Sequence, residues 1–466
     1  MALTYQSTRG QAPELDFYGV TMAGLAADGG LYLPKIWPQF STSELAALAG
    51  VPYREAAARV LRPFVAPMLK DEVLSHLLQV AYASFVDPAI TPLRQLDDRR
   101  WILELFHGPT LAFKDVALQF LGHLFEHFLS HNGQRLTVIG ATSGDTGSAA
   151  IAALANRKNI DVFILYPHGR PSEIQRKQMT CVDAPNVHAM AIEGSFDDCQ
   201  AIVKNLFNNA SFRSQYNLAA VNSINWARIL AQIVYYFFAA VKLGAPEKAV
   251  SFVVPTGNFG NVFAGYAAMK CGLPISKLAV ASNRNDILTR FFASGTMQTE
   301  VVHATLSPSM DIQISSNFER LLFDLCQGNA GTVTTLTEEL RKDGVFSISK
   351  HQLAMARQVF SAGTADDTET IKAIKDTYDN SGILLDPHTA VGLAVGGKLS
   401  RELPDPVVML ACAHPAKFPE TIQRAIGITP ELPAPVAALL RQPERLSLLP
   451  ANVLTVQNFI AARVAS

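Results

Sequence analysis

The sequence has few cysteines, almost no net charge and no long hydrophobic run, and each shortage excludes a class of protein. Its five cysteines stand at irregular spacing, which fits neither a disulfide framework nor a zinc site and is typical of a reducing compartment. The 39 basic and 40 acidic side chains leave a net charge of -1, so nothing indicates a nucleic-acid or anionic-membrane partner. The longest apolar stretch, residues 229–241, is too short to cross a bilayer. The N-terminus lacks a signal-peptide core, and we therefore expect a cytoplasmic protein.

Short apolar strands alternate with helical segments over much of the chain, which predicts an α/β fold with parallel sheets covered on both faces. The strands are expected at 136–140, 162–166, 187–192, 250–254, 278–281 and 407–411. Helices are expected at 146–156, 197–209, 223–241 and 261–271.

Two regions break this rhythm. Helical periodicity dominates residues 42–85, which predicts a helical N-terminal region. Between 283 and 364 the alternation is lost, and we expect a helical insertion with helices near 317–326 and 351–361. No coiled coil or exposed apolar stripe is identifiable, so monomer and homodimer both stay open.

Lys114 is the first candidate for chemistry. It follows Phe113 and a Gly-Pro turn, and an apolar run comes after it. Desolvation disfavours an ammonium group, so a lysine among apolar neighbours releases its proton more easily. A Schiff-base lysine needs that property. Taken alone, the position favours an ordinary surface lysine at a helix start, because buried lysines are rare.

Two strand-to-helix loops are candidates for binding anions, because the N–H groups at a helix N-terminus are unpaired. In the first, residues 141–147, the hydroxyls of Thr142, Ser143 and Thr146 add donors suited to a substrate carboxylate. An ordinary turn with a capping residue explains this loop equally well. The second loop, residues 255–261, lacks the nucleotide-binding glycine patterns. The candidate ligand that remains is a small phosphate group. It would be held by the N–H groups of Gly257, Asn258, Phe259, Gly260 and Asn261.

A third group is Ser223, Asn225 and Arg228, where serine and arginine could reach a second phosphate. A capping serine and a solvated arginine would be the plainer interpretation. A reactive lysine with two anion loops is nevertheless what a pyridoxal phosphate enzyme needs: an attachment point, a cradle for the cofactor phosphate and a cradle for an amino-acid carboxylate.

Several longer motifs resemble those of threonine synthases, in the long form of bacteria and fungi. They are Ser7-Thr8-Arg9-Gly10, Phe113-Lys114-Asp115, the loops at 142–147 and 257–261, the segment 222–228, Ser307-Pro308-Ser309-Met310-Asp311-Ile312 and Ala413-His414-Pro415-Ala416-Lys417-Phe418. The resemblance runs from the N-terminus to about residue 425.

The resemblance implies a fold type II pyridoxal phosphate enzyme, with two parallel-sheet domains of the tryptophan synthase β-like architecture. The division it suggests is an N-terminal domain (1–95), a large cofactor-binding domain (96–125, 216–282 and 365–425), a small α/β domain (126–215), a helical insertion (283–364) and a C-terminal extension (426–466).

The implied reaction converts O-phospho-L-homoserine and water to L-threonine and phosphate. Lys114 would attach the cofactor and then move protons, and Asp145 would lie beside the cofactor's 3′-oxygen. Residues 257–261 would hold the cofactor phosphate. The substrate carboxylate and phosphate would be bound by Thr142, Ser143, Thr146, Ser223, Asn225 and Arg228.

Cys412 departs from the family pattern, in which Thr or Ser precedes Ala-His-Pro and faces the pyridine nitrogen. A thiol is a weaker hydrogen-bond partner than a hydroxyl, so either Cys412 fills this role poorly or a neighbour such as His414 or a water replaces it.

Two other functions stay open: a phospholyase that releases 2-oxobutyrate, and a binding protein without catalysis. His123, His127 and His131 share one helical face, which fits a half-exposed surface better than a metal site.

Overall fold

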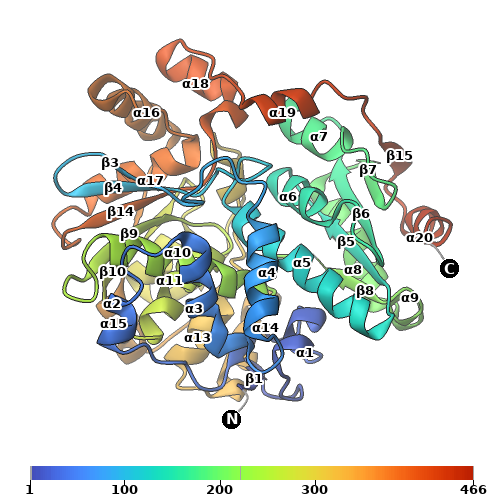
Figure 1. The fold of residues 1–466 in the computed structure, drawn as a ribbon, viewed down its shortest axis with the longest axis horizontal. Helices are drawn as coiled ribbons and strands as arrows, with labels where there is room; N and C mark the ends of the chain where they lie inside the picture. Colours follow the sequence, from blue (N-terminus) through green and yellow to red (C-terminus); the bar gives the residue numbers. More distant parts are fainter. Residues whose placement is uncertain (1–2, 221, 465–466) are drawn as a thin grey trace.

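The computed structural model describes residues 3–220 and 222–464, and two separate sheets organise it (Figure 1). The larger sheet has the strand order β13-β10-β9-β14-β4-β3, in which β3 pairs antiparallel with β4 and the other neighbours pair in parallel. Its strands are β3 (Leu93–Gln95), β4 (Arg100–Glu104), β9 (Val250–Pro255), β10 (Ile275–Ser282), β13 (Phe360–Thr364) and β14 (Val407–Ala411).

The smaller sheet is parallel throughout, with the order β15-β7-β6-β5-β8. Its strands are β5 (Leu136–Ala141), β6 (Ile160–Pro167), β7 (Val187–Glu193), β8 (Leu218–Ala220) and β15 (Ser447–Pro450). The parallel α/β fold expected from the alternation of strands and helices is therefore confirmed.

Both faces of the larger sheet are covered, which explains why its central strands β9 and β14 are buried throughout and largely apolar. In β9, Phe252 and Val254 belong to the main hydrophobic core, while Val253 between them belongs to a second core. Helix α11 (Gly260–Lys270) packs on β9 and β10, and α17 (Pro387–Lys398) packs on β9, β10 and β14.

Helix α10 (Trp226–Lys242) lies in the main core, packed against α11, α3 (Tyr53–Val65) and α5 (Lys114–Asn132). Every residue from Trp226 to Val241 is buried, as expected for a helix that is apolar all round. The helix was expected from residue 223 and begins three residues later, because the Asn225 side chain accepts a hydrogen bond from the Ala227 N–H and caps it.

The N-terminal region is helical as expected. Helix α3 (Tyr53–Val65) packs on α10, and α4 (Asp71–Ala81) packs on α5 (Lys114–Asn132). The other N-terminal elements are β1 (Tyr5–Ser7), α1 (Phe17–Ala23), β2 (Tyr32–Pro34) and α2 (Thr42–Ala46). This region therefore supports the helix whose first residue is Lys114.

The insertion contains helices and one antiparallel strand pair, β11 with β12. Its elements are α12 (Ile287–Ser294), β11 (Thr296–Gln298), η1 (Pro308–Met310), α13 (Phe318–Leu325), α14 (Ala330–Asp343), β12 (Val345–Ser347) and α15 (Lys350–Val359). The expected helix at 351–361 was wrong at its end, because residues 360–364 form β13 and pair in parallel with β10. A strand that follows a helix without a loop gives no separate periodic signal.

The five-part division of the chain stays a prediction. Three short strands, however, pair with strands that the division assigns to another part of the chain. Strand β3 lies in the expected N-terminal domain and pairs with β4 of the large domain. Strand β8 lies in the expected large domain and pairs with β5 of the small sheet, and β15 adds a strand from the C-terminal extension to β7. Each has three or four residues, too few for alternation to be recognised.

The remaining helices connect or cover the two sheets, and none of the helices in the described ranges is long and apolar enough to span a membrane. They are α6 (Asp145–Leu154), α7 (Glu173–Thr180), α8 (Phe196–Asn208), α9 (Ala210–Gln215), α16 (Asp367–Ser381), η2 (Pro415–Lys417), α18 (Pro419–Ile426), α19 (Ala434–Leu439) and α20 (Val453–Ala461).

Candidate active site

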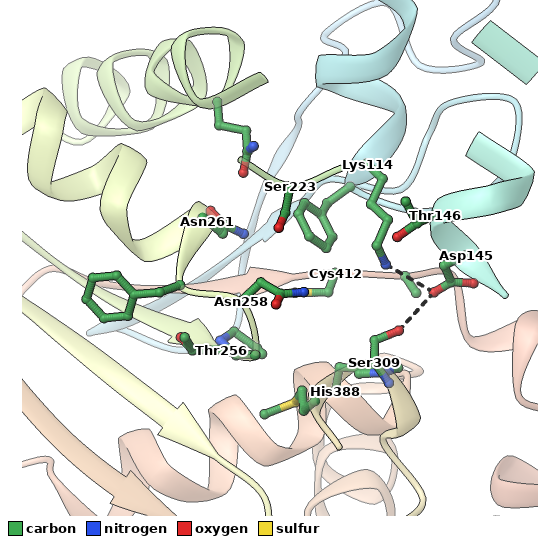
Figure 2. A pocket seen from close by; sticks show the side chains of 18 of the residues that line it. Lys114, Asp145, Thr146, Ser223, Thr256, Asn258, Asn261, Ser309, His388 and Cys412 are labelled. Atoms are coloured by element: carbon green, nitrogen blue, oxygen red, sulfur yellow. Dashed lines mark hydrogen bonds and ion pairs between the residues drawn. The ribbon is translucent and has the colours of Figure 1, made fainter. Parts of the chain in front are cut away.

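Lys114 is the first residue of α5, and main-chain bonds hold the turn before it against the end of β14. The Phe113 N–H donates to the Cys412 carbonyl at 2.8 Å, and the His414 N–H donates to the Leu111 carbonyl at 3.0 Å. The lysine side chain is 11% exposed and lines a pocket between the two sheets (Figure 2). Burial lowers the pKa of Lys114, and the nearby Asp145 carboxylate opposes this only in part.

Asp145 opens α6 and connects two lysines. Its Oδ2 lies 3.5 Å from the Lys114 Nζ, and its Oδ1 lies 2.8 Å from the Nζ of Lys417. Gln175 donates to Oδ1 at 3.0 Å, and the Ser309 hydroxyl donates to Oδ2 at 3.4 Å. Burial alone would raise the pKa of the Asp145 carboxyl, but the two ammonium groups outweigh it and hold that pKa well below its usual range.

The second predicted loop opens onto this pocket. All five residues predicted to hold a phosphate, Gly257, Asn258, Phe259, Gly260 and Asn261, line the pocket together with Thr256. Helix α11 begins at Gly260 after Phe259, whose φ is 62°, and in the part of the chain that the structure describes no side chain caps it. Its first N–H groups are therefore available for an anion.

Two side-chain nitrogen atoms of pocket-lining residues are unpaired within the described residues. The Asn261 Nδ2 and the Arg228 Nε are buried and have no hydrogen-bond partner among residues 3–220 and 222–464. Buried polar groups are normally paired. A Cβ added at Gly257 would lie 2.8 Å from the Ser309 carbonyl oxygen, so only glycine fits here. The cradle at 256–261 and these donors fit a bound phosphate.

The first predicted loop contributes less than expected. Thr146 and Asp145 line the pocket. The Thr142 hydroxyl instead accepts from the N–H groups of Gly144 and Gly147, at 3.0 and 2.9 Å, and Ser143 is exposed. Neither Thr142 nor Ser143 is among the pocket-lining residues, so their predicted contact with a substrate stays a prediction.

In the third predicted group, too, only some of the residues line the pocket. Ser223 and Arg228 line the pocket. Asn225 is buried outside it, because its Nδ2 donates to the Thr21 carbonyl at 2.9 Å while its oxygen caps α10. Arg228 donates to the Asn222 carbonyl at 2.6 Å, and burial lowers the pKa of its guanidinium to about 10. The side chain therefore stays cationic at neutral pH.

Cys412 lies in the pocket at the end of β14 (Figure 2). Burial raises the pKa of its thiol well above the usual value, so the group is a neutral thiol. Its Sγ lies 3.7 Å from the Leu410 carbonyl oxygen. His414, the proposed replacement, has its side-chain Nδ1 engaged with the Ala416 N–H at 3.2 Å and does not line the pocket.

Several residues of the site had no predicted role, among them Ser309, His388 and Lys417. Ser309 and His388 line the pocket, and Lys417 is fully buried behind Asp145. The His388 Nδ1 lies 2.8 Å from Asp386, and its Nε2 accepts from the Ser309 N–H at 3.2 Å. Ser309 and Lys417 stand in motifs that carry the family resemblance, whereas no spacing pattern marks His388.

The histidine face on α5 is occupied by other contacts. The guanidinium of Arg157 lies 2.8 and 2.9 Å from the ring nitrogens of His123, and the rings of His127 and His131 are 4.4 Å apart. In the described ranges, no three His, Cys, Asp or Glu side chains are grouped as a metal ion would require.

Comparison with known proteins gives consistent matches along the chain. Residues 88–352 match the model of pyridoxal-phosphate dependent enzymes, residues 4–82 that of the threonine synthase N terminus, and residues 389–460 that of the threonine synthase C-terminal region. A threonine synthase of Pseudomonas aeruginosa is 51% identical over 460 residues, which cover 98% of both chains.

Solved structures agree with these matches. The crystal structure of a threonine synthase from Brucella melitensis with bound pyridoxal phosphate is 48% identical, covers 100% of both chains and has a TM-score of 0.96. The yeast threonine synthase structure is 42% identical, with 99% and 98% coverage and a TM-score of 0.94.

Proposed function

This chain belongs to the threonine synthase family, and from that premise we propose that its pocket performs the reaction of that family. The reaction converts O-phospho-L-homoserine and water to L-threonine and phosphate, the last step of threonine biosynthesis, with pyridoxal phosphate as cofactor. The observation that carries the proposal is a buried lysine, Lys114, in one pocket with the uncapped N-terminus of α11.

Residues 257–261 bind the cofactor phosphate through the N–H groups that open α11. The unpartnered Asn261 Nδ2 adds a donor. Gly257 keeps the backbone close to the loop that carries Ser309, and Asn317 donates to the Asn258 carbonyl at 3.0 Å, so the cradle is held before the cofactor arrives.

Lys114 attaches the cofactor and then moves protons at Cα, Cβ and Cγ of the substrate. Its lowered pKa favours the neutral amine that both tasks need. When bound, pyridoxal phosphate supplies the electron sink that stabilises negative charge on the substrate carbons. Asp145 faces Lys114 and keeps the ammonium form accessible when the lysine has taken up a proton.

Arg228 and Ser223 bind the substrate phosphate, and Thr146 binds its carboxylate. The guanidinium of Arg228 is cationic and has an unpartnered Nε, which suits it to a phosphate oxygen. After cleavage the phosphate stays on these residues and orients the water that adds at Cβ. We also propose that the protein acts in the cytoplasm, as a monomer or a homodimer, with neither nucleic acid nor membrane as partner.

Product analysis tests this function. The purified protein, loaded with pyridoxal phosphate, is incubated with O-phospho-L-homoserine, and threonine, phosphate and 2-oxobutyrate are measured. We expect threonine and phosphate in equal amounts, and neither product from the Lys114→Ala variant. Phosphate with 2-oxobutyrate and no threonine would instead identify a phospholyase. A protein that stays colourless with added cofactor would contradict both enzyme functions and leave a binding protein.

A further inference from the structure

Lys417 is a second buried lysine in the site, and nothing in the proposed reaction uses it. It belongs to the short helix η2 just after β14, and its side chain is 0% exposed. Its Nζ donates to the Thr110 carbonyl at 2.8 Å and lies 2.8 Å from the Asp145 Oδ1. Lys417 therefore connects η2, the turn before Lys114 and the start of α6.

The two lysines do not share Asp145 equally. Lys417 holds Oδ1 at 2.8 Å, a distance typical of a charge-assisted hydrogen bond. Lys114 lies 3.5 Å from Oδ2, beyond the usual range of such a bond. Lys417 also has a second acceptor, the Thr110 carbonyl, whereas Asp145 is the acceptor that faces the Lys114 Nζ (Figure 2).

Lys114 and Lys417 face the same buried carboxylate, Asp145, and their ammonium groups repel each other, although Asp115 also lies near Lys417. The like charge of one ammonium disfavours the charged form of the other. Releasing one proton removes this repulsion. Because Lys417 has the shorter pair and the extra acceptor, Lys114 is the lysine that releases it.

We propose that Lys417 is a positioning residue that engages Asp145 from behind and thereby sets the pH at which Lys114 gives up its proton. The inference rests on the proposed function, since it assigns the task of attaching the cofactor to Lys114. Lys417 acts through Asp145 and lies outside the set of pocket-lining residues.

Other charged or titratable groups also face Lys114, and the test must hold them constant. They are Asp145 at the start of α6, Arg228 of α10 and Cys412 after β14, with His388 of α17 on the same pocket wall. Asp115 and His414 face Lys417 from their own elements. Replacing Lys417 leaves all of these groups in place.

The experiment is a pH titration of the visible absorbance of the full chain loaded with pyridoxal phosphate. The variants are Lys417→Met and Lys417→Gln, which remove the charge, and Lys417→Arg, which keeps it. Removing a cation favours the protonated form of the lysine nitrogen at position 114. We therefore expect the midpoint to rise on the order of one pH unit in both neutral variants and to stay at the wild-type value in the arginine variant.

The same midpoint in all four proteins would overturn the proposal, because a purely structural Lys417 would alter stability without moving the titration. An equal shift in the arginine and methionine variants would also overturn it, since geometry rather than charge would then be the cause. If the neutral variants fail to load the cofactor, the pH dependence of Lys114 modification by an amine-directed reagent in the unloaded chains gives the same comparison. A wild-type protein without visible absorbance would refute the proposed function, not this inference alone.

Discussion

The two strand-to-helix loops at 141–147 and 255–261 look alike in sequence and differ in what their N–H groups do. Each continues with a threonine directly after its strand. Thr142 accepts hydrogen bonds from two N–H groups of its own loop, whereas Thr256 donates to the Val254 carbonyl at 2.6 Å. The first loop is therefore closed on itself, and the second leaves its N–H groups to the pocket. A glycine-rich turn predicts that another group can come close to the backbone. Whether that group can be a ligand depends on the threonine hydroxyl, which accepts from the N–H groups of the first loop and donates to a carbonyl in the second.

Replacement of one glycine in each loop tests this comparison most strongly. In Gly257→Ala the new methyl group would meet the Ser309 carbonyl oxygen at 2.8 Å, so the backbone must move and the phosphate cradle with it. We expect cofactor affinity to fall by roughly 100-fold, the loss typical of a displacement of about 1 Å in a binding site. The affinity is measured by titrating the unloaded protein with pyridoxal phosphate.

The matched variant in the closed loop is Gly147→Ala. Its methyl group would collide first with the Thr142 Cγ2 of the same loop and would lie 2.9 Å from the Ile164 Cγ2 and 2.9 Å from the Met179 Sδ, inside the protein rather than at the pocket. Overpacking of this kind costs about 1–3 kcal/mol of stability, and the folded fraction should bind the cofactor normally. An equal loss of cofactor affinity in both variants would show that the two loops do the same work.

Thr142→Val should cost stability rather than affinity. The substitution keeps the shape of the side chain and removes the acceptor for two buried N–H groups. Each unpaired buried donor costs about 1–3 kcal/mol, so the two donors predict a loss of roughly 2–6 kcal/mol in denaturant unfolding. Thr256→Val, which loses one donated bond, is the control and should lose about 1 kcal/mol. A fall in substrate affinity without a loss of stability would return Thr142 to its predicted role in substrate binding.

Thr146→Val and Ser143→Ala separate the two hydroxyls that the sequence did not distinguish. Thr146 lines the pocket, and Ser143 is exposed outside it. Loss of one hydrogen bond worth about 1 kcal/mol should lower kcat/KM by roughly five- to tenfold in Thr146→Val, chiefly by raising KM. Ser143→Ala should leave both constants within about twofold, since it removes no contact in the pocket. Steady-state kinetics with O-phospho-L-homoserine would contradict this order if the two variants lost activity equally.

The sequence predicted the main strands and the buried surroundings of Lys114 well, for physical reasons that particular residues make clear. The strands β6, β9 and β14 are buried at every position and largely apolar, with Asp161 and Ser251 as exceptions, because both of their faces are covered. Lys114 stood out because its apolar neighbours and the two loops agree on one chemistry. The short strands β3, β8 and β15 could not be predicted, since their pairing depends on residues far away in the chain.

The same limit applies to the site. The sequence places Thr142, Thr146 and Asn225 equally near a helix start. Only the folded structure shows that Thr146 lines the pocket, whereas the side chains of Thr142 and Asn225 form hydrogen bonds with main-chain groups. His388 and Lys417 reach the site from distant segments, where they contact Ser309, Asp145 and Thr110. Such contacts leave no local pattern, because they join segments that the chain order keeps apart.

Cys412→Thr should have the smallest effect, and it tests a pocket residue that belongs to neither loop. The thiol is neutral, and among residues 3–220 and 222–464 its one hydrogen-bond contact is a long one to the Leu410 carbonyl oxygen, at 3.7 Å. Its position is fixed by the backbone, because the Cys412 N–H donates to the Thr389 hydroxyl at 3.1 Å. A threonine hydroxyl can occupy the same place and is the better hydrogen-bond partner, so we expect turnover to stay equal or to rise. A fall in turnover of more than about tenfold, equivalent to about 1.4 kcal/mol in the barrier, would contradict a shared role. The pocket would then depend on the size or polarisability of sulfur at this position rather than on a hydrogen bond to the cofactor ring.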